Sequence, residues 1–254
     1  MHLSCLLVDV GEDPDRPRPG RLWVRNLYRV HQRLCMAFPS RSKRSEDENF
    51  LGPFDPGDFN KSVHVRRGAD TGFLFRIDPM SGGRVIILVQ SATRPDWDYA
   101  FRNAQYLLTG PPMTKPYDPS FKVHQHLRFR LLANPTRKVD TKSGPDGKKN
   151  NGRRVPVPAD KLSEWLTGRS IATGFRVVTI NDLQAGFQYF SKDLPSESED
   201  HPSEKGRLRS VRYDGTLEVL DPVVFRETII KGIGPGKSFG FGLLSVMAVT
   251  EKVT

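Results

Sequence analysis

Residues 208–249 read Leu208-Arg-Ser-Val-Arg-Tyr-Asp-Gly-Thr-Leu-Glu-Val-Leu-Asp-Pro-Val-Val-Phe-Arg-Glu-Thr-Ile-Ile-Lys-Gly-Ile-Gly-Pro-Gly-Lys-Ser-Phe-Gly-Phe-Gly-Leu-Leu-Ser-Val-Met-Ala-Val249. Alternating apolar residues flank Asp214-Gly215, a dipeptide typical of a β-hairpin turn. Asp221-Pro222 supplies a helix N-cap followed by proline at the first helical position, and Gly232 is the residue type that ends helices. The stretch therefore predicts a hairpin, a helix, a glycine-rich loop and a last strand at 243–249.

The patterns nearer the N-terminus predict the same kinds of element in a similar order. They indicate strands at 2–9, 72–90 (as a hairpin), 123–131 and 175–180, and helices at 25–38, 97–108 and 158–168. Segments without periodicity predict loops at 39–71 and 191–206, a basic and flexible hairpin tip at 137–154, and a linker at 111–119.

Both halves of the chain thus follow the order β-α-β-β-(α)-β. This order is typical of the ferredoxin-like (RRM-like) βαββαβ fold, in the α+β class. We expect two tandem domains, 1–118 and 119–254, with the glycine-rich loop in the second. No sequence repeat relates the halves, so the predicted duplication rests on element order alone.

Composition excludes several classes of protein. Two cysteines, Cys5 and Cys35, are too few for a disulfide scaffold or a cysteine-rich zinc site, and they favour a reducing cytosol. The longest apolar run, Val85–Val89, is far shorter than the roughly 18 residues that span a membrane. The N-terminus lacks a basic region and a cleavage site, so it predicts a strand and not a signal peptide.

Positive charge is concentrated in one part of the chain. The 254 residues carry a formal net charge of +10, and residues 121–170 hold twelve basic and four acidic residues. A solvated surface is the ordinary explanation of a charge run, but this concentration beside a glycine-rich loop favours a nucleic-acid footprint. Paired ferredoxin-like units favour RNA in particular, by analogy of fold.

The glycine-rich segment 232–242 is not a nucleotide-binding loop of a known type. A phosphate loop needs glycine where this chain has Lys231, and it leads from a strand into a helix, whereas this segment leads from a helix into a strand. The G-x-G-x-x-G pattern fails at Phe239. Two interpretations stay open: a close approach of a ligand's phosphates aided by Lys237, or a tight chain reversal that packs the last strand.

Two pairs of residues are candidates for chemistry. Tyr28 and His31 lie three apart on the first helix and share a face, as an acid/base pair would. Spacing alone favours the simpler alternative, in which both side chains cap the rim of the core. His124 and His126 share a strand face, but no third metal ligand lies at a recognisable spacing.

Five ordered motifs resemble the CasE family, the CRISPR-associated endoribonucleases of type I-E Cascade systems. The most specific is the glycine-rich run Gly232-Ile-Gly-Pro-Gly-Lys-Ser-Phe-Gly-Phe-Gly-Leu-Leu-Ser-Val246. The others are Leu127–Lys138, Arg153-Arg154-Val155 with Lys161–Leu166, Leu217–Pro222 and Asn26–His31. Together they span nearly the whole chain.

The resemblance implies metal-independent cleavage of CRISPR precursor RNA on the 3′ side of a repeat hairpin, by attack of a ribose 2′-OH on the adjacent phosphate. It implies that His31 is the general acid/base and Tyr28 its partner, with no metal and no cofactor. It also implies a prokaryotic cytoplasmic protein that meets the repeat hairpin and the other Cascade subunits (backbone subunits at the crRNA 3′ end), and target DNA only through the complex. The loops 39–71, 139–152 and 193–204 look longer than the core needs, so no role is carried over to them.

From charge and matched motifs we expect RNA contacts from residues of the second half of the chain. They are Arg128, Arg130, Arg137, Lys138, Arg153, Arg154, Arg207, Arg209, Gly234, Gly236, Lys237 and Ser238. A non-catalytic subunit that binds the RNA hairpin is the alternative function. A nucleotide-dependent enzyme is a third class, and it rests only on Gly236-Lys237-Ser238.

Overall fold

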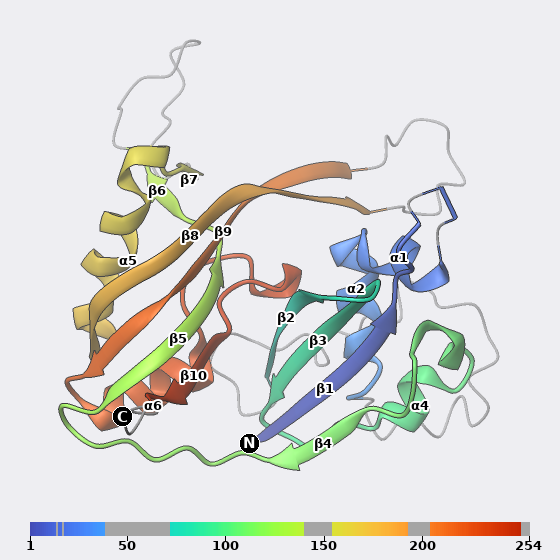
Figure 1. The fold of residues 1–254 in the computed structure, drawn as a ribbon, viewed down its shortest axis with the longest axis horizontal. Helices are drawn as coiled ribbons and strands as arrows, with labels where there is room; N and C mark the ends of the chain where they lie inside the picture. Colours follow the sequence, from blue (N-terminus) through green and yellow to red (C-terminus); the bar gives the residue numbers. More distant parts are fainter. Residues whose placement is uncertain (14, 17, 39–71, 140–153, 193–203, 250–254) are drawn as a thin grey trace. The chain divides into compact units, whose positions relative to one another are not determined.

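The computed structural model describes the chain except for residues 14, 17, 39–71, 140–153, 193–203 and 250–254 (Figure 1). The chain forms two compact units. The first unit comprises Met1–Asp118, Tyr189–Arg207 and Ser238–Gly240. The second unit comprises Pro119–Gln188, Leu208–Lys237 and Phe241–Thr254. The predicted loop 39–71 lies outside the described residues.

The first unit is built around a four-stranded antiparallel sheet with the strand order β2-β3-β1-β4. Its elements are β1 (His2–Asp9), α1 (Pro19–Val24), α2 (Leu27–Cys35), β2 (Phe73–Met80), β3 (Arg84–Ser91), α4 (Trp97–Phe101), the 3-10 turn η2 (Gln105–Leu107) and β4 (Met113–Pro116). β1 is central, and its neighbours in space are not its neighbours in sequence. This is the ferredoxin-like order that the element pattern predicted.

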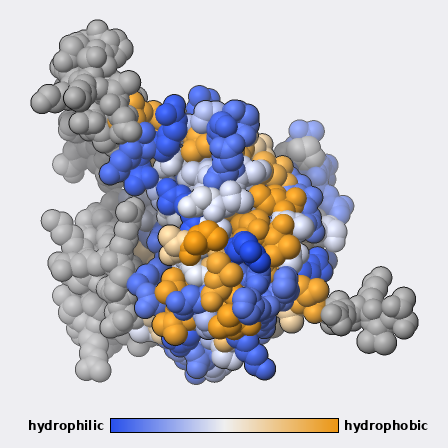
Figure 2. Space-filling view, turned by 90° about the vertical axis from the view of Figure 1, so that its left-hand side faces the viewer, coloured by the Kyte–Doolittle hydropathy of each residue, from blue (hydrophilic) through white to orange (hydrophobic). Residues whose placement is uncertain are grey.

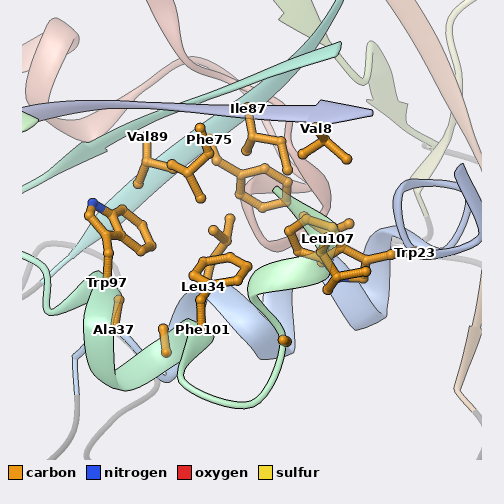
Figure 3. Close-up of a cluster of buried hydrophobic side chains, with 14 of the residues drawn as sticks. Val8, Trp23, Leu34, Ala37, Phe75, Ile87, Val89, Trp97, Phe101 and Leu107 are labelled. Atoms are coloured by element: carbon orange, nitrogen blue, oxygen red, sulfur yellow. The ribbon is translucent and has the colours of Figure 1, made fainter. Parts of the chain in front are cut away.

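The core of the first unit lies between this sheet and its helices. Alternation along β1 buries Leu6 and Val8, and the apolar stripe of α2 buries Val30 and Leu34. Aromatic side chains from α4 complete the cluster (Figure 3). The core thereby fixes α2 by its apolar face; of the helix residues that are not buried, Arg29 is exposed and the others are half-buried.

Two predictions for the first unit need correction. Segment 111–119 was expected to be a linker, but Met113–Pro116 pairs with β1 as a short edge strand, where proline is tolerated. The helix α1 was not predicted, because its packing against β1, α2 and Phe101 brings together residues from several other elements. A Cβ atom on Gly20 would lie 2.3 Å from the Asp9 carbonyl oxygen, so only glycine lets α1 approach β1 this closely.

The second unit contains a second antiparallel four-stranded sheet, with the order β10-β5-β9-β8. Its elements are β5 (His126–Ala133), β6 (Thr136–Lys138), β7 (Arg154–Pro156), the 3-10 turn η3 (Ala159–Lys161), α5 (Leu162–Ser170), η4 (Ile171–Thr173), β8 (Phe175–Lys192), β9 (Glu204–Val219), α6 (Pro222–Lys231), η5 (Lys237–Phe239) and β10 (Leu244–Ala248). The ends of β8 and β9, and Ser238–Phe239 of η5, group with the first unit. The predicted fold class, with two ferredoxin-like sheets, is confirmed.

The hairpin predicted at Asp214-Gly215 is wrong. β9 runs unbroken from Glu204 to Val219 through both residues. A Cβ atom on Gly215 would lie 2.1 Å from the Thr179 carbonyl oxygen, so glycine serves here a close backbone approach to β8 and not a turn. The predicted loop 191–206 is likewise wrong at both ends, which belong to β8 and β9; residues 193–203 lie outside the described part.

Helix α6 begins and ends where the sequence predicts. The Asp221 carboxylate accepts hydrogen bonds from the backbone N–H groups of Val223 at 2.9 Å and Val224 at 3.0 Å. Gly232 ends the helix with a φ of 69°. Both boundaries are local, which is why the sequence alone locates them.

Both cysteines, Cys5 and Cys35, are free thiols. Among the described residues, no helix has both the length and the apolar character needed to cross a bilayer.

Candidate active site

The N-terminus of α2 positions the candidate pair Tyr28 and His31. The Asn26 side chain caps the helix by accepting from the Tyr28 backbone N–H at 3.1 Å, and its amide donates to the Ser191 carbonyl at 3.0 Å. The spacing of three residues places Tyr28 and His31 on one side of the helix, and both side chains are half-buried. The cap therefore fixes the start of the helix and joins it to the end of β8 within the first unit.

His31 lies in a largely apolar environment. Its ring stacks near Phe73, with centroids 5.6 Å apart, and near Phe75, with centroids 6.4 Å apart. The Cys35 sulfur, one helical turn on, lies 3.6 Å from Nε2 and 4.0 Å from Nδ1. Burial raises the pKa of the Cys35 thiol to about 12, so this group stays protonated and neutral at physiological pH. Of these two neighbouring side chains, the imidazole is therefore the candidate for proton transfer.

The glycine-rich segment satisfies the chain-reversal interpretation in detail. The two ends of the segment are joined by the Ile233 N–H, which donates to the Gly242 carbonyl at 2.9 Å. The Gly242 N–H donates in turn to the Leu132 carbonyl on β5 at 2.7 Å. Positive φ values occur at Gly232, Gly234, Gly236, Gly240 and Gly242. Side chains would be strained at all of these positions, so the backbone conformation by itself accounts for the glycines. Contact of the segment with RNA stays a prediction.

The predicted RNA-binding residues of this segment fall in different units. Gly234, Gly236 and Lys237 group with the second unit, and Ser238, which is exposed, groups with the first unit, as do Tyr28 and His31. The Lys237 ammonium donates to the Lys231 carbonyl at the end of α6. Lys237 thus stabilises the turn after α6, whether or not it also contacts a ligand.

Acidic side chains partly neutralise the positive charge on the second sheet. Arg130 Nε donates to the Asp214 carboxylate at 2.6 Å, whereas Arg128, two residues earlier on the same strand face, is exposed. Arg212 pairs with Asp182 and Asp214, each at 2.8 Å. Arg128 is therefore better placed than Arg130 to meet an anion.

The hairpin of β6 and β7 concentrates exposed cations. Lys138 lies directly opposite Arg154 in the strand register, and Arg137 beside it is exposed too. Like charges facing each other across strands destabilise a hairpin, so this arrangement favours a polyanion as partner. Arg153, the remaining predicted member, lies outside the described residues.

Arg169 lies within the electrostatic influence of Arg154 on this basic hairpin, and it was not among the residues predicted from the sequence to bind RNA. Its guanidinium lies 4.8 Å from the centroid of the Trp165 ring, one turn earlier on α5. Burial, and then the nearby positive charge of Arg154, lower the pKa of Arg169. The spacing of Trp165 and Arg169 by four residues was the sequence signal that could have found it.

Near the start of β9, Arg207 is exposed and groups with the first unit. Arg209 lies 5.6 Å from the Phe187 ring centroid, and its buried Nε has no hydrogen-bond partner among the described residues. The side of the protein on the left of Figure 1 interleaves hydrophilic and hydrophobic surface (Figure 2).

A buried carboxylate on β9, that of Glu218, is expected to make the stability of the second unit depend on pH. Hydrogen bonds from His124, at 2.7 Å, and from Arg176 hold the pKa of Glu218 below its usual range. A carboxylate whose pKa is lowered by folding stabilises the fold at pH values above the ordinary glutamate pKa of about 4.3. This stabilisation is lost as the pH falls through the lowered pKa of the folded state. We therefore expect the melting temperature to fall less steeply below about pH 4.3 in Glu218→Gln than in the wild type.

Glu164→Gln is the matched control for this measurement. Glu164 pairs with Lys161 at 3.0 Å but both side chains are exposed, so its removal should leave the wild-type pH dependence. Parallel melting curves for Glu218→Gln and the wild type from pH 6 to pH 3 would contradict the assignment.

Comparison with known proteins places this geometry in a family. The family described as CRISPR associated protein matches residues 1–247. The chain is 35% identical over 200 residues to CRISPR-associated endoribonuclease Cse3 of Thermus thermophilus, an alignment covering 73% of this chain and 85% of that protein. It is 28% identical over 230 residues to CRISPR system Cascade subunit CasE of Escherichia coli, covering 89% and 94% of the two chains.

The fold agrees with this assignment. The solved structure of Thermus thermophilus Cse3 bound to an RNA representing a pre-cleavage complex matches with a TM-score of 0.62 and 26% sequence identity, over 97% of this chain and 98% of that one. The resemblance drawn from the five motifs is thereby confirmed, and the chain belongs to the family of CRISPR-associated proteins, with Cse3 and CasE as its relatives.

Proposed function

We propose that this protein is an endoribonuclease that cleaves CRISPR precursor RNA on the 3′ side of the repeat hairpin. The observation that carries the proposal is the half-buried imidazole of His31, on one helix face with Tyr28 and held among Phe73, Phe75 and Cys35. The two relatives, one an endoribonuclease and the other a Cascade subunit, support it.

The reaction is an internal phosphoryl transfer. A base removes the proton of the ribose 2′-OH, the 2′ oxygen forms a bond to the adjacent phosphorus, and the bond from phosphorus to the 5′ oxygen breaks. An acid returns a proton to the 5′ oxygen, so the products carry a 2′,3′-cyclic phosphate and a 5′-OH. Because the nucleophile belongs to the RNA, the step consumes neither water nor a cofactor.

His31 is the proton-transfer group in this scheme, with Tyr28 as its partner. Imidazole takes up and releases protons near neutral pH, and positioned proton transfer contributes about 10²–10⁴-fold to rates. Burial raises the pKa of the neighbouring Cys35 thiol to about 12, so the thiol stays protonated and no thiolate competes for the proton.

In this proposal the second unit binds the phosphate backbone of the RNA. The exposed cations of the β6–β7 hairpin, together with Arg128 and Arg169, present positive charge to a phosphate backbone. We infer that the protein keeps the product hairpin as a subunit of Cascade, next to the backbone subunits at the crRNA 3′ end. Target DNA then meets it only through the complex, in a prokaryotic cytoplasm.

Cleavage of a repeat RNA in excess EDTA tests the proposal. We expect one cut below the stem. The upstream fragment should end in a 2′,3′-cyclic phosphate, which blocks 3′ ligation until acid opens the ring and a phosphatase then removes the resulting monophosphate. Loss of cleavage in EDTA with recovery on adding Mg²⁺ would overturn metal independence. Tight hairpin binding without any cut would favour the non-catalytic alternative.

A further inference from the structure

An aromatic surface on β2 faces the imidazole of His31. Phe73 and Phe75 lie two residues apart on the strand, so they share a side of the sheet. The planes of their rings are inclined by 29° and 18° to the His31 ring. Phe38 extends the row by stacking on Phe73 with centroids 5.2 Å apart. The ring of His31 therefore has limited freedom to turn on this side.

Phe75 is in turn held by the glycine-rich segment. Its side chain is fully buried, in the core beside Ile87 and Val89 (Figure 3). A Cβ atom built on Gly240 would lie 3.1 Å from the Phe75 ring, closer than carbon atoms normally approach, and Gly240 has a φ of +81°. All of these residues belong to the first unit. Glycine at 240 thus leaves the space that the Phe75 ring occupies beneath His31.

Cys35 restrains the imidazole from the helix side. It is 3% exposed, and its sulfur lies within 4.0 Å of both ring nitrogens. A thiol is a weak hydrogen-bond partner, so it fills the space beside the ring without holding the proton that catalysis must move.

We propose that Phe73, Phe75 and Cys35 are positioning residues for His31, and that Gly240 links the glycine-rich segment to catalysis by keeping Phe75 in place. The inference rests on the proposed function. It gives part of the glycine-rich segment a task other than contact with RNA: the orientation of the group that transfers the proton.

The first test compares two glycine substitutions at similar positive φ values. Gly240→Ala and Gly82→Ala both put a side chain at positive φ, +81° and +72°, but the new methyl at 82 meets only the mobile guanidinium of Arg84, at 3.4 Å. Because small misplacements of catalytic groups are costly, we expect Gly240→Ala to lower the single-turnover cleavage rate by about three- to tenfold. The dissociation constant of the RNA should stay within about twofold, and Gly82→Ala should cleave like the wild type.

A second test removes the stacking ring without touching the glycine-rich segment. Phe73 is half-buried, so Phe73→Leu keeps an apolar side chain at a tolerant site. We expect a rate loss like that of Gly240→Ala, and recovery in Phe73→Tyr, which restores the ring. In the protein without RNA, the His31 Cε1–H resonance should move downfield in Phe73→Leu as the ring current disappears.

The outcomes separate the inference from the proposed function. Wild-type cleavage by His31→Ala would overturn the catalytic assignment. Loss of cleavage in His31→Ala together with wild-type rates in Gly240→Ala and Phe73→Leu would overturn only the positioning roles. A rate loss in Gly240→Ala that is matched by Gly82→Ala, or by an equal loss of RNA affinity, would also overturn them. An unmoved His31 resonance in Phe73→Leu would overturn the stacking itself.

Discussion

Replacing His31 with alanine is expected to slow cleavage of the repeat RNA by about 10²–10⁴-fold, the usual contribution of a positioned acid or base. The imidazole lies at a half-buried position beside Phe73 and Cys35, and alanine leaves no group there that can take or give a proton. The measurement is a single-turnover rate at saturating protein, in EDTA and near neutral pH.

Gln32→Ala is the control for this experiment. Gln32 is the next residue on α2 and is half-buried like His31, but its side chain leaves the helix about 100° away. We expect it to cleave normally, while His31→Ala still binds the hairpin with wild-type affinity. Wild-type cleavage by His31→Ala would show that another group transfers the proton.

Replacing Gly215 with alanine is expected to lower the free energy of unfolding by about 3 kcal/mol or more, at the upper end of overpacking effects. The new Cβ would meet the Thr179 carbonyl oxygen at 2.1 Å and its carbon at 3.0 Å, and this backbone cannot withdraw without breaking the pairing of β8 with β9. The measurement is urea unfolding, with hydrogen exchange to locate the loss in β5, β8 and β9.

Gly186→Ala is the matched control. Gly186 lies within β8, and a Cβ atom there meets nothing within 4 Å. Alanine at this position should be neutral, or stabilising by about 0.4–1 kcal/mol through the unfolded chain. Equal stability of Gly215→Ala and Gly186→Ala would contradict the close approach of β8 to β9.

The sequence was informative wherever structure follows from neighbours along the chain. The helix at α2 follows from Leu27, Val30 and Leu34 at helical spacing, and α6 from its Asp221 cap and the Gly232 stop. The spacing of Tyr28 and His31 was enough to predict that they share a helix face. The order of the five motifs was enough to recognise the family.

The predictions from the sequence were wrong where one sequence pattern can have two different physical causes. Asp-Gly is common in tight turns, but glycine is equally required where two strands approach too closely for a Cβ atom, as at Gly215. Nothing local distinguishes the two causes, because the deciding atom belongs to Thr179 on another strand. The short edge strand β4 was missed in the same way, since only its pairing with β1 makes it a strand.

The sequence by itself determined the two repeated element orders, the concentration of basic residues and the candidate pair on α2, because periodicity, capping and charge are local properties. Only the tertiary structure decided that Asp214 neutralises Arg130, that β9 is continuous, that Phe73 and Phe75 lie beside His31, and that Gly240 lies against Phe75. These groups are separated by tens to hundreds of residues, so their contacts depend on sheet order and core packing.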